Sequence, residues 1–130
     1  MRLLLDTNAW LFMINAPDRL GERLAATLRD PANELFLSVA SVWEMVIQYS
    51  LGKLPLPVPP NEFVPPRLRR DRVRLLPVTA EQLFAVSALP YHHRDPFDRL
   101  LIGAAVTESL TLVTTDAALR AYGVPLITNR

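Results

Sequence analysis

Short, uninterrupted apolar segments, separated by helix-like segments, constrain the fold of this chain more than any other feature. The segments 3–5, 35–37 and 112–113 contain no polar residue. Continuous apolar runs of this length are typical of parallel strands, which are buried on both faces. Strand-like and helix-like segments alternate along the chain, which predicts helices on both sides of a parallel sheet. We therefore expect an α/β fold with three αβα layers around a short central parallel sheet.

The expected elements follow from apolar periodicity and from the proline and glycine residues that end helices. Strands are predicted at residues 2–5, 35–38, 73–77, 112–114 and 125–127. Helices are predicted at residues 7–15, 20–29, 41–51, 61–70, 96–108 and 117–122, with a further helix that Thr79 caps and that runs to about residue 88. The proline-rich connector 54–60 is too short for a domain boundary. We expect one domain over residues 1–130.

Composition excludes several classes of protein. Half of the residues are apolar and 21% are charged, which argues against intrinsic disorder. No apolar run approaches the ~18 residues that span a bilayer, so we expect no membrane segment. The chain has no cysteine, which excludes disulfides and thiolate metal sites and fits the cytoplasm.

Charge gives only a weak indication of a partner. The net charge is +1, but five of the 13 arginines lie within residues 67–74. This run is interpreted first as a solvated helix end, and arginine in place of lysine also suits contact with phosphate.

Four acidic residues lie where a predicted strand ends or a predicted helix begins. They are Asp6, Glu44, Asp98 and Asp116. The carboxyl ends of parallel strands meet at one edge of the sheet, where ligand sites of open α/β folds lie. Carboxylates gathered there repel one another unless cations lie between them. The pattern therefore predicts a divalent-metal site.

Helix capping is the alternative role for each acid taken alone. Asp6, Asp95 and Asp116 each stand where an N-cap is expected, and Ser41 with Glu44 matches a capping box. Neutral capping residues already stand beside the acid at residues 7–8, 41 and 114–115. The acids therefore exceed what capping requires, which favours the metal site.

Five segments carry a resemblance to a known family. LLLDTN, SVWE, LGKLPLP, HHRDPFDRLLIGAA and LVTTD, in this order over essentially the whole chain, resemble the PIN-domain ribonucleases, specifically the VapC-type toxins of bacterial toxin–antitoxin pairs. The resemblance implies a set of metal-binding, catalytic acids: Asp6, Glu44, Asp98 and Asp116. It implies supporting polar roles for Asn8 and Thr114. Asp95 is expected to be an N-cap first and an outer acid of the site second.

The implied activity is an endoribonuclease that depends on Mg²⁺, or on Mn²⁺, and cleaves RNA by metal-activated water. Its products would be a 5′-phosphate and a 3′-hydroxyl. By the same resemblance we expect an antitoxin protein as partner, with a C-terminal segment that crosses the acidic groove. The high apolar content and the aromatic residues predict a homodimer.

Other classes of protein were weighed against this interpretation. A PIN nuclease of RNA processing and a catalytically silent PIN-like binding module stay open. A phospho-acceptor receiver domain would need a lysine near the last strands, but the one lysine is Lys53. A phosphatase with an aspartate nucleophile would need a second aspartate where Asn8 stands.

Several residues receive no single role from the sequence. His92 and His93 are interpreted as incidental loop residues, and Lys53 as a complement to a helix end. Arg94 and Arg99 could bind substrate phosphate or pair with the neighbouring acids. The tryptophans, Trp10 and Trp43, are assigned to the core or to a dimer interface.

Overall fold

The computed structural model describes residues 1–129 and has a five-stranded, fully parallel sheet in the order β3-β2-β1-β4-β5. Residue 130, the last of the expected domain, lies outside the described residues. The strands are β1 (Arg2–Leu5), β2 (Glu34–Ser38), β3 (Val73–Leu76), β4 (Thr111–Thr114) and β5 (Leu126–Thr128). The helices are α1 (Thr7–Asn15), α2 (Glu22–Arg29), α3 (Val39–Ser50), α4 (Pro60–Arg70), α5 (Ala80–Ser87) and α6 (Pro96–Glu108), with 3₁₀ segments η1 (Pro17–Leu20) and η2 (Ala117–Tyr122).

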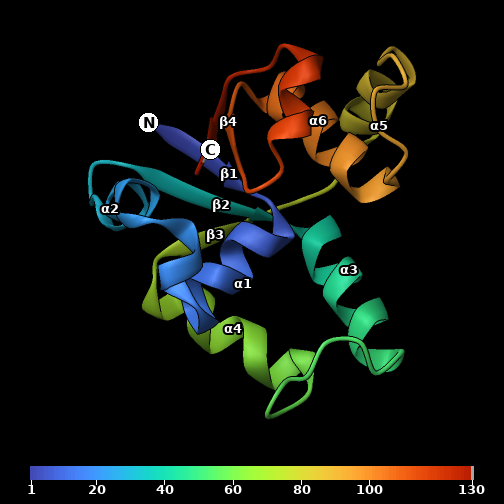
Figure 1. The fold of residues 1–130 in the computed structure, drawn as a ribbon. Helices are drawn as coiled ribbons and strands as arrows, with labels where there is room; N and C mark the ends of the chain where they lie inside the picture. The colour runs from blue at the N-terminus through green and yellow to red at the C-terminus, as the bar shows by residue number, and fades with distance from the viewer. Residues whose placement is uncertain (130) are drawn as a thin grey trace.

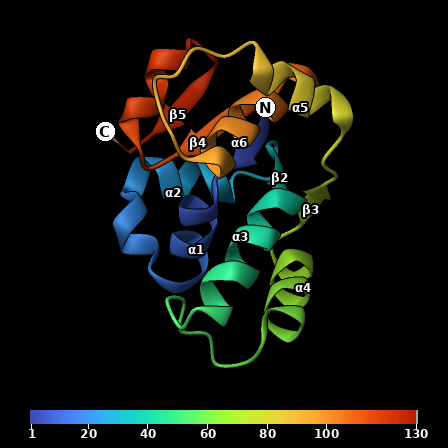
Figure 2. The ribbon, with the colours of Figure 1, turned by 90° about the vertical axis from the view of Figure 1, so that its right-hand side faces the viewer.

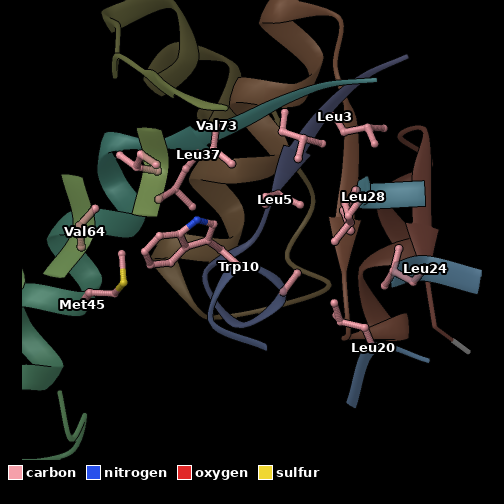
Figure 3. Close-up of a cluster of buried hydrophobic side chains, with 14 of the residues drawn as sticks. Leu3, Leu5, Trp10, Leu20, Leu24, Leu28, Leu37, Met45, Val64 and Val73 are labelled. Atoms are coloured by element: carbon pink, nitrogen blue, oxygen red, sulfur yellow. The ribbon is translucent and has the colours of Figure 1, made fainter. Parts of the chain in front are cut away.

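Helices cover both faces of the sheet, which confirms the expected three-layer αβα fold. In Figures 1 and 2, α1, α2 and α4 lie on one side, and α5 and α6 lie on the other. Alternate residues of β1 explain the two layers: Leu3 and Leu5 join one apolar cluster, whereas Leu4 joins the other. Figure 3 shows the first cluster around Trp10, a fully buried residue whose ring packs edge-on against Phe63.

Most of the predicted strands and helices are confirmed within one or two residues at their ends, α3 included, but the cap predicted for α3 was wrong. This helix begins at Val39 because the Ser38 hydroxyl accepts a hydrogen bond from the N–H of Ala40. Ser41 is therefore inside the helix, and Glu44 lies beyond its first turn. The predicted capping box at Ser41 and Glu44 does not form. Glu44 consequently has no capping role that could explain its carboxylate.

Strand order places a natural ligand site beside β1. The chain runs from β1 outward to β2 and β3, and then crosses to β4 on the other side of β1. Ligands of open α/β sheets bind at the carboxyl edge where the direction of winding reverses. Here the reversal lies between β1 and β4, directly before Asp6 and Asp116. The N–H of Asp6 extends this pairing, because it donates to the Val113 carbonyl at 2.9 Å.

No helix within residues 1–129 combines the length and the apolar character needed to cross a bilayer.

Replacing Gly103 with alanine should destabilise the protein. Gly103 is the point where α6 approaches α5, and a Cβ there would lie 2.6 Å from the Gln82 carbonyl oxygen and 2.8 Å from Val86 Cγ2. Overpacking should outweigh the gain in helix propensity and lower the free energy of unfolding by about 1–3 kcal/mol. Urea unfolding measures the loss. The matched control is Val106→Ala on the exposed side of the same helix, which should change little; equal stability of both variants would contradict the close contact.

Candidate metal centre

Asp6 is the most buried acid at the carboxyl edge of the sheet, with 6% of its surface exposed. Its Oδ1 accepts a hydrogen bond from the N–H of Ala9 at 2.7 Å, so it does cap α1. Burial raises the pKa of Asp6, and the charges of Glu44 and Asp116 raise it further, while the Thr114 hydroxyl and the Ala9 N–H lower it. The capping bond thus leaves a carboxylate that is buried and close to other acids.

The other acids belong to the same electrostatic cluster. Burial raises the pKa of Glu44, and Asp95 adds to this, while the Thr7 hydroxyl opposes it. Burial also raises the pKa of Asp98, to about 6, and the charges of Asp95 and Asp6 raise it further, while the hydrogen bond and the charge of His93 lower it. Burial and neighbouring carboxylates thus make Asp6, Glu44 and Asp98 harder to ionise.

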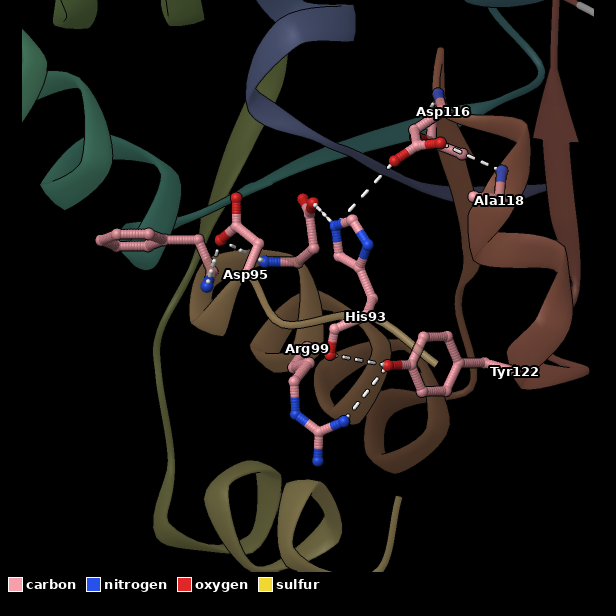
Figure 4. A network of polar contacts seen from close by, with 9 residues as sticks. His93, Asp95, Arg99, Asp116, Ala118 and Tyr122 are labelled. Carbon is pink, nitrogen blue, oxygen red and sulfur yellow. Dashed lines mark hydrogen bonds and ion pairs between the residues drawn. The ribbon is translucent and has the colours of Figure 1, made fainter. Parts of the chain in front are cut away.

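Asp116 shows that one side chain can cap a helix and still direct its second carboxylate oxygen at the acidic cluster. Its Oδ1 accepts from the N–H of Ala118 at 3.0 Å, while its Oδ2 lies 3.9 Å from His93 Nε2 (Figure 4). One carboxylate oxygen orders η2, and the second faces the cluster. Capping by the aspartates was therefore correctly predicted, but it does not exclude a ligand role.

The predicted supporting residues lie beside these acids. Thr114 is fully buried; its hydroxyl bonds Asp6 and accepts from the N–H of Asp116 at 3.0 Å. Asp95 caps α6 as expected, with its Oδ1 2.8 Å from the N–H of Phe97. Asn8 lines a cavity of about 210 Å³ together with Glu44 and Lys53. The lysine that was assigned to a helix end thus lines the same cavity as a predicted metal ligand.

His93 is the functional candidate that sequence reasoning missed. Its Nε2 lies 2.8 Å from Asp98 Oδ2, and its ring reaches the space between Asp98 and Asp116. The ligand atoms of these three side chains all lie within 4.8 Å of one another. The signal that could have found it is the spacing His-x-x-x-x-Asp across the start of a predicted helix, which places a loop side chain above the first turn.

Arg99 bonds backbone carbonyls and a hydroxyl rather than the neighbouring acids. It is 5% exposed, and its guanidinium donates to the carbonyls of Pro90 at 2.8 Å and of Val86 and Leu89, each at 3.3 Å. It also donates to the Tyr122 hydroxyl at 3.2 Å (Figure 4). Arg99 pairs with no neighbouring acid in the part of the chain that the structure describes. It holds the segment before α6 in place.

The arginine run lies away from the acids. It covers the end of α4 and the start of β3, and therefore the amino edge of the parallel sheet. Arg70 pairs with Asp71 at 3.1 Å, and Arg74 lies 3.8 Å from Glu34, both at exposed positions. These pairs favour the solvated interpretation of the run over direct contact with substrate at the acidic site.

The donor set suits a hard divalent cation. Four carboxylates, at the end of β1, in α3, in α6 and at the N-cap of η2, offer the oxygen ligands that Mg²⁺ and Mn²⁺ take. Burial and neighbouring acids raise the pKa of three of them, Asp6, Glu44 and Asp98. A cation among them would offset the repulsion. The residues present therefore fit a metal ion.

The pH dependence of stability should report the Asp98 environment. Because the pKa of Asp98 in the metal-free fold is about 6 and its ordinary value is 3.8, the fold retains this proton where the unfolded chain has released it. The stabilisation that comes from the protonated Asp98 carboxyl is fully present below pH 3.8. The free energy of unfolding then falls as the pH rises to about 6, by about 2–3 kcal/mol in total. Urea unfolding in EDTA, across this window, should show a steeper decline for the native chain than for Asp98→Asn. Parallel curves would contradict the raised pKa.

Comparisons with known proteins agree with this fold. The family model of the PIN domain matches residues 3–125. Ribonuclease VapC16 of Mycobacterium tuberculosis is 51% identical over 45 residues, a match that covers 35% of this chain and only 32% of that protein.

Solved structures cover nearly the full length at low identity. The VapBC2 complex of Rickettsia felis, bound to a DNA fragment from its promoter, has a chain with a TM-score of 0.75 and 20% identity, covering 98% of each chain. The DNA-bound VapBC complex of Salmonella typhimurium has a TM-score of 0.70 and 16% identity, covering 100% of this chain and 99% of the other. At such identity the likeness shows the fold.

Proposed function

The chain belongs to the PIN-domain family, and from this premise we propose that it is a cytoplasmic, metal-dependent endoribonuclease, the toxin of a toxin–antitoxin pair. The observation that carries the proposal is the coupled cluster of Asp6, Glu44, Asp98 and Asp116 at the winding reversal of the sheet. The local identity to a named ribonuclease supports the activity.

The proposed cofactor is Mg²⁺, with Mn²⁺ as the alternative, held by these four acids. Such an ion supplies positive charge that makes water a better nucleophile and stabilises the phosphodiester transition state. Thr114 fixes Asp6 and Asp116 relative to each other, because its hydroxyl contacts both. The N–H of Ala9 bonds one carboxylate oxygen of Asp6, and the N–H of Ala118 bonds one carboxylate oxygen of Asp116. These bonds fix the direction in which the other oxygen of each carboxylate points.

The proposed substrate is RNA, cleaved by water without participation of the 2′-hydroxyl. The water oxygen bonds to phosphorus, the bond from phosphorus to the 3′ oxygen breaks, and the 3′ oxygen leaves with a proton. The products are a 5′-phosphate and a 3′-hydroxyl. A mechanism that used the 2′-hydroxyl would instead leave a cyclic phosphate.

A direct experiment is incubation of the purified protein with a panel of structured RNAs, in Mg²⁺ and in EDTA, followed by mapping of the product ends. Cleavage in Mg²⁺ that yields 5′-phosphates, and no cleavage in EDTA, is expected. Cyclic phosphate ends or EDTA-resistant cleavage would refute the proposed mechanism. RNA binding without cleavage would favour a silent binding module.

The proposed protein partners are an antitoxin and a second copy of the chain. Structures of similar fold are complexes named VapBC, which supports an antitoxin partner. On α3, Val39, Trp43 and Val46 are 42%, 59% and 37% exposed. Their spacing places them on one side of the helix, as an apolar stripe that favours a protein interface. Trp43 thus has no place in the core, and its interface role stays a prediction.

Trp43→Asp should convert the proposed homodimer into monomers, because a charge would be buried in an apolar contact. Light scattering at micromolar concentration measures the change. Phe84→Ala is the matched control, since Phe84 is another exposed aromatic residue, at 71%, on α5. A native chain that is already monomeric would refute the homodimer.

A further inference from the structure

His93 occupies the position of a ligand at the acidic cluster. Its Nε2 lies 2.8 Å from Asp98 Oδ2 and 3.9 Å from Asp116 Oδ2, so one nitrogen faces oxygens from two different elements. The side chain is 28% exposed, which leaves it shielded but accessible to a small ion. Figure 4 shows the imidazole directed toward Asp116.

The backbone of His93 is held in place from the opposite side of the site. The Tyr122 hydroxyl donates to the His93 carbonyl at 3.4 Å, and the same hydroxyl accepts from Arg99. The ring of the neighbouring His92 packs edge-on against Tyr122, with centroids 5.2 Å apart. The loop before α6 is thereby attached to α6 and to η2, the two elements that carry Asp98 and Asp116. A side chain on this loop is therefore presented to the cluster in a fixed orientation.

The distances fit one shared cation. In octahedral coordination, bonds of ~2.1 Å place neighbouring ligand atoms ~3 Å apart and opposite ones ~4.2 Å apart. The two separations of His93 Nε2, 2.8 and 3.9 Å, fall close to this range. In a hydrogen bond between an imidazole nitrogen and a carboxylate, both groups point toward the shared proton. A metal ion can take the place of that proton.

We propose that His93 binds the catalytic cation through Nε2, together with Asp98 and Asp116, and so adds a nitrogen to a site otherwise built of oxygens. The inference rests on the proposed function only in requiring that a divalent ion binds at these acids. A nitrogen ligand favours first-row transition ions over Mg²⁺, which strongly prefers oxygen. The centre should therefore bind Mn²⁺ more tightly than Mg²⁺, and His93 should account for part of the difference.

Electron paramagnetic resonance tests the assignment without any measurement of activity. The full chain is produced with ¹⁵N-labelled histidine and loaded with one equivalent of Mn²⁺, and pulsed spectra are searched for ¹⁵N coupling. Because His92 and His93 are the two histidines of the sequence, His92→Gln and His93→Gln form a matched pair. Coupling is expected in the native chain and in His92→Gln, and it should be absent in His93→Gln. Calorimetry should show that Mn²⁺ binding weakens about tenfold in His93→Gln, with a smaller change for Mg²⁺.

Three other results would overturn the assignment. In the first, the native chain binds Mn²⁺ without ¹⁵N coupling, and Asp6→Asn loses that binding. The proposed metal-dependent function would then stand, and His93 would only orient Asp98. Loss of the ¹⁵N coupling in His92→Gln would show that His92, and not His93, supplies the nitrogen ligand. Absence of any Mn²⁺ binding by the native chain would refute both the ligand and the metal centre. The native chain alone shows whether Mn²⁺ binds and whether ¹⁵N coupling is present, so a refutation of the His93 ligand does not depend on the folding of a variant.

Discussion

RNA cleavage by Asp6→Asn should fall by a factor on the order of 10²–10³ or more, because one buried ligand charge is removed from the metal centre. Asp98→Asn and Asp116→Asn should show the same loss. The rates are measured in Mg²⁺ on the RNA that the native chain cleaves best. Melting temperatures are measured on the same preparations without metal.

Stability should move independently of activity in these variants. The asparagine oxygen at position 6 can still accept from the Ala9 amide, so the cap of α1 survives. Burial and the neighbouring acids raise the pKa of Asp6, so its ionised form opposes folding at neutral pH. The neutral amide removes that penalty, and metal-free stability should hold or rise.

Asp18→Asn is the matched control, since Asp18 is an exposed acid in the first turn of η1. It should change neither cleavage nor melting temperature. Full cleavage by all three site variants would reject the catalytic assignment. Marked unfolding of these variants would instead show that the acids act chiefly as structural caps.

The fold could be predicted because its signals are local. Leu3 to Leu5 form an apolar run that is typical of a doubly buried strand, and Pro17 and Gly52 mark where helices end. The cap of α3 was missed because Ser38-Val39 continues the apolar pattern of β2 without a visible break. Only the bond from the Ala40 amide to the Ser38 hydroxyl shows that the strand has already ended.

The approach of Asp6, Asp98 and Asp116 to one another could also be predicted, because each stands at the end of a strand or the start of a helix, whereas Glu44 lies inside α3. The contacts that hold His93 and Arg99 in place could not be predicted, because Tyr122, whose hydroxyl bonds both residues, comes from a distant segment. Tyr122 contacts Arg99 across 23 positions and His93 across 29. No spacing rule within one helix or strand predicts such contacts. The exposure of Trp43 was equally hidden, since a tryptophan in an apolar helix fits the core or an interface.

Replacing Arg99 with lysine should destabilise the protein by about 2–4 kcal/mol, since bonds from a buried charged donor to several acceptors are lost. The guanidinium reaches three carbonyls and the Tyr122 hydroxyl at once, and an ammonium group cannot match that planar geometry. Differential scanning calorimetry should show a melting temperature lower by about 10 °C. Tyr122→Phe removes only the hydroxyl between Arg99 and His93 and should lower stability by about 1 kcal/mol.

The same variant separates a structural role of Arg99 from contact with substrate phosphate. If Arg99 only holds the loop, Arg99→Lys should change the melting temperature strongly, and KM for RNA should be near its native value wherever the variant remains folded. The matched control is Arg94→Lys at the exposed arginine of the same loop, which should melt normally. A normal melting temperature with a raised KM in Arg99→Lys would reverse the assignment. The reason to expect otherwise is burial: Arg99 is 5% exposed, and both terminal nitrogens of its guanidinium already donate to backbone carbonyls.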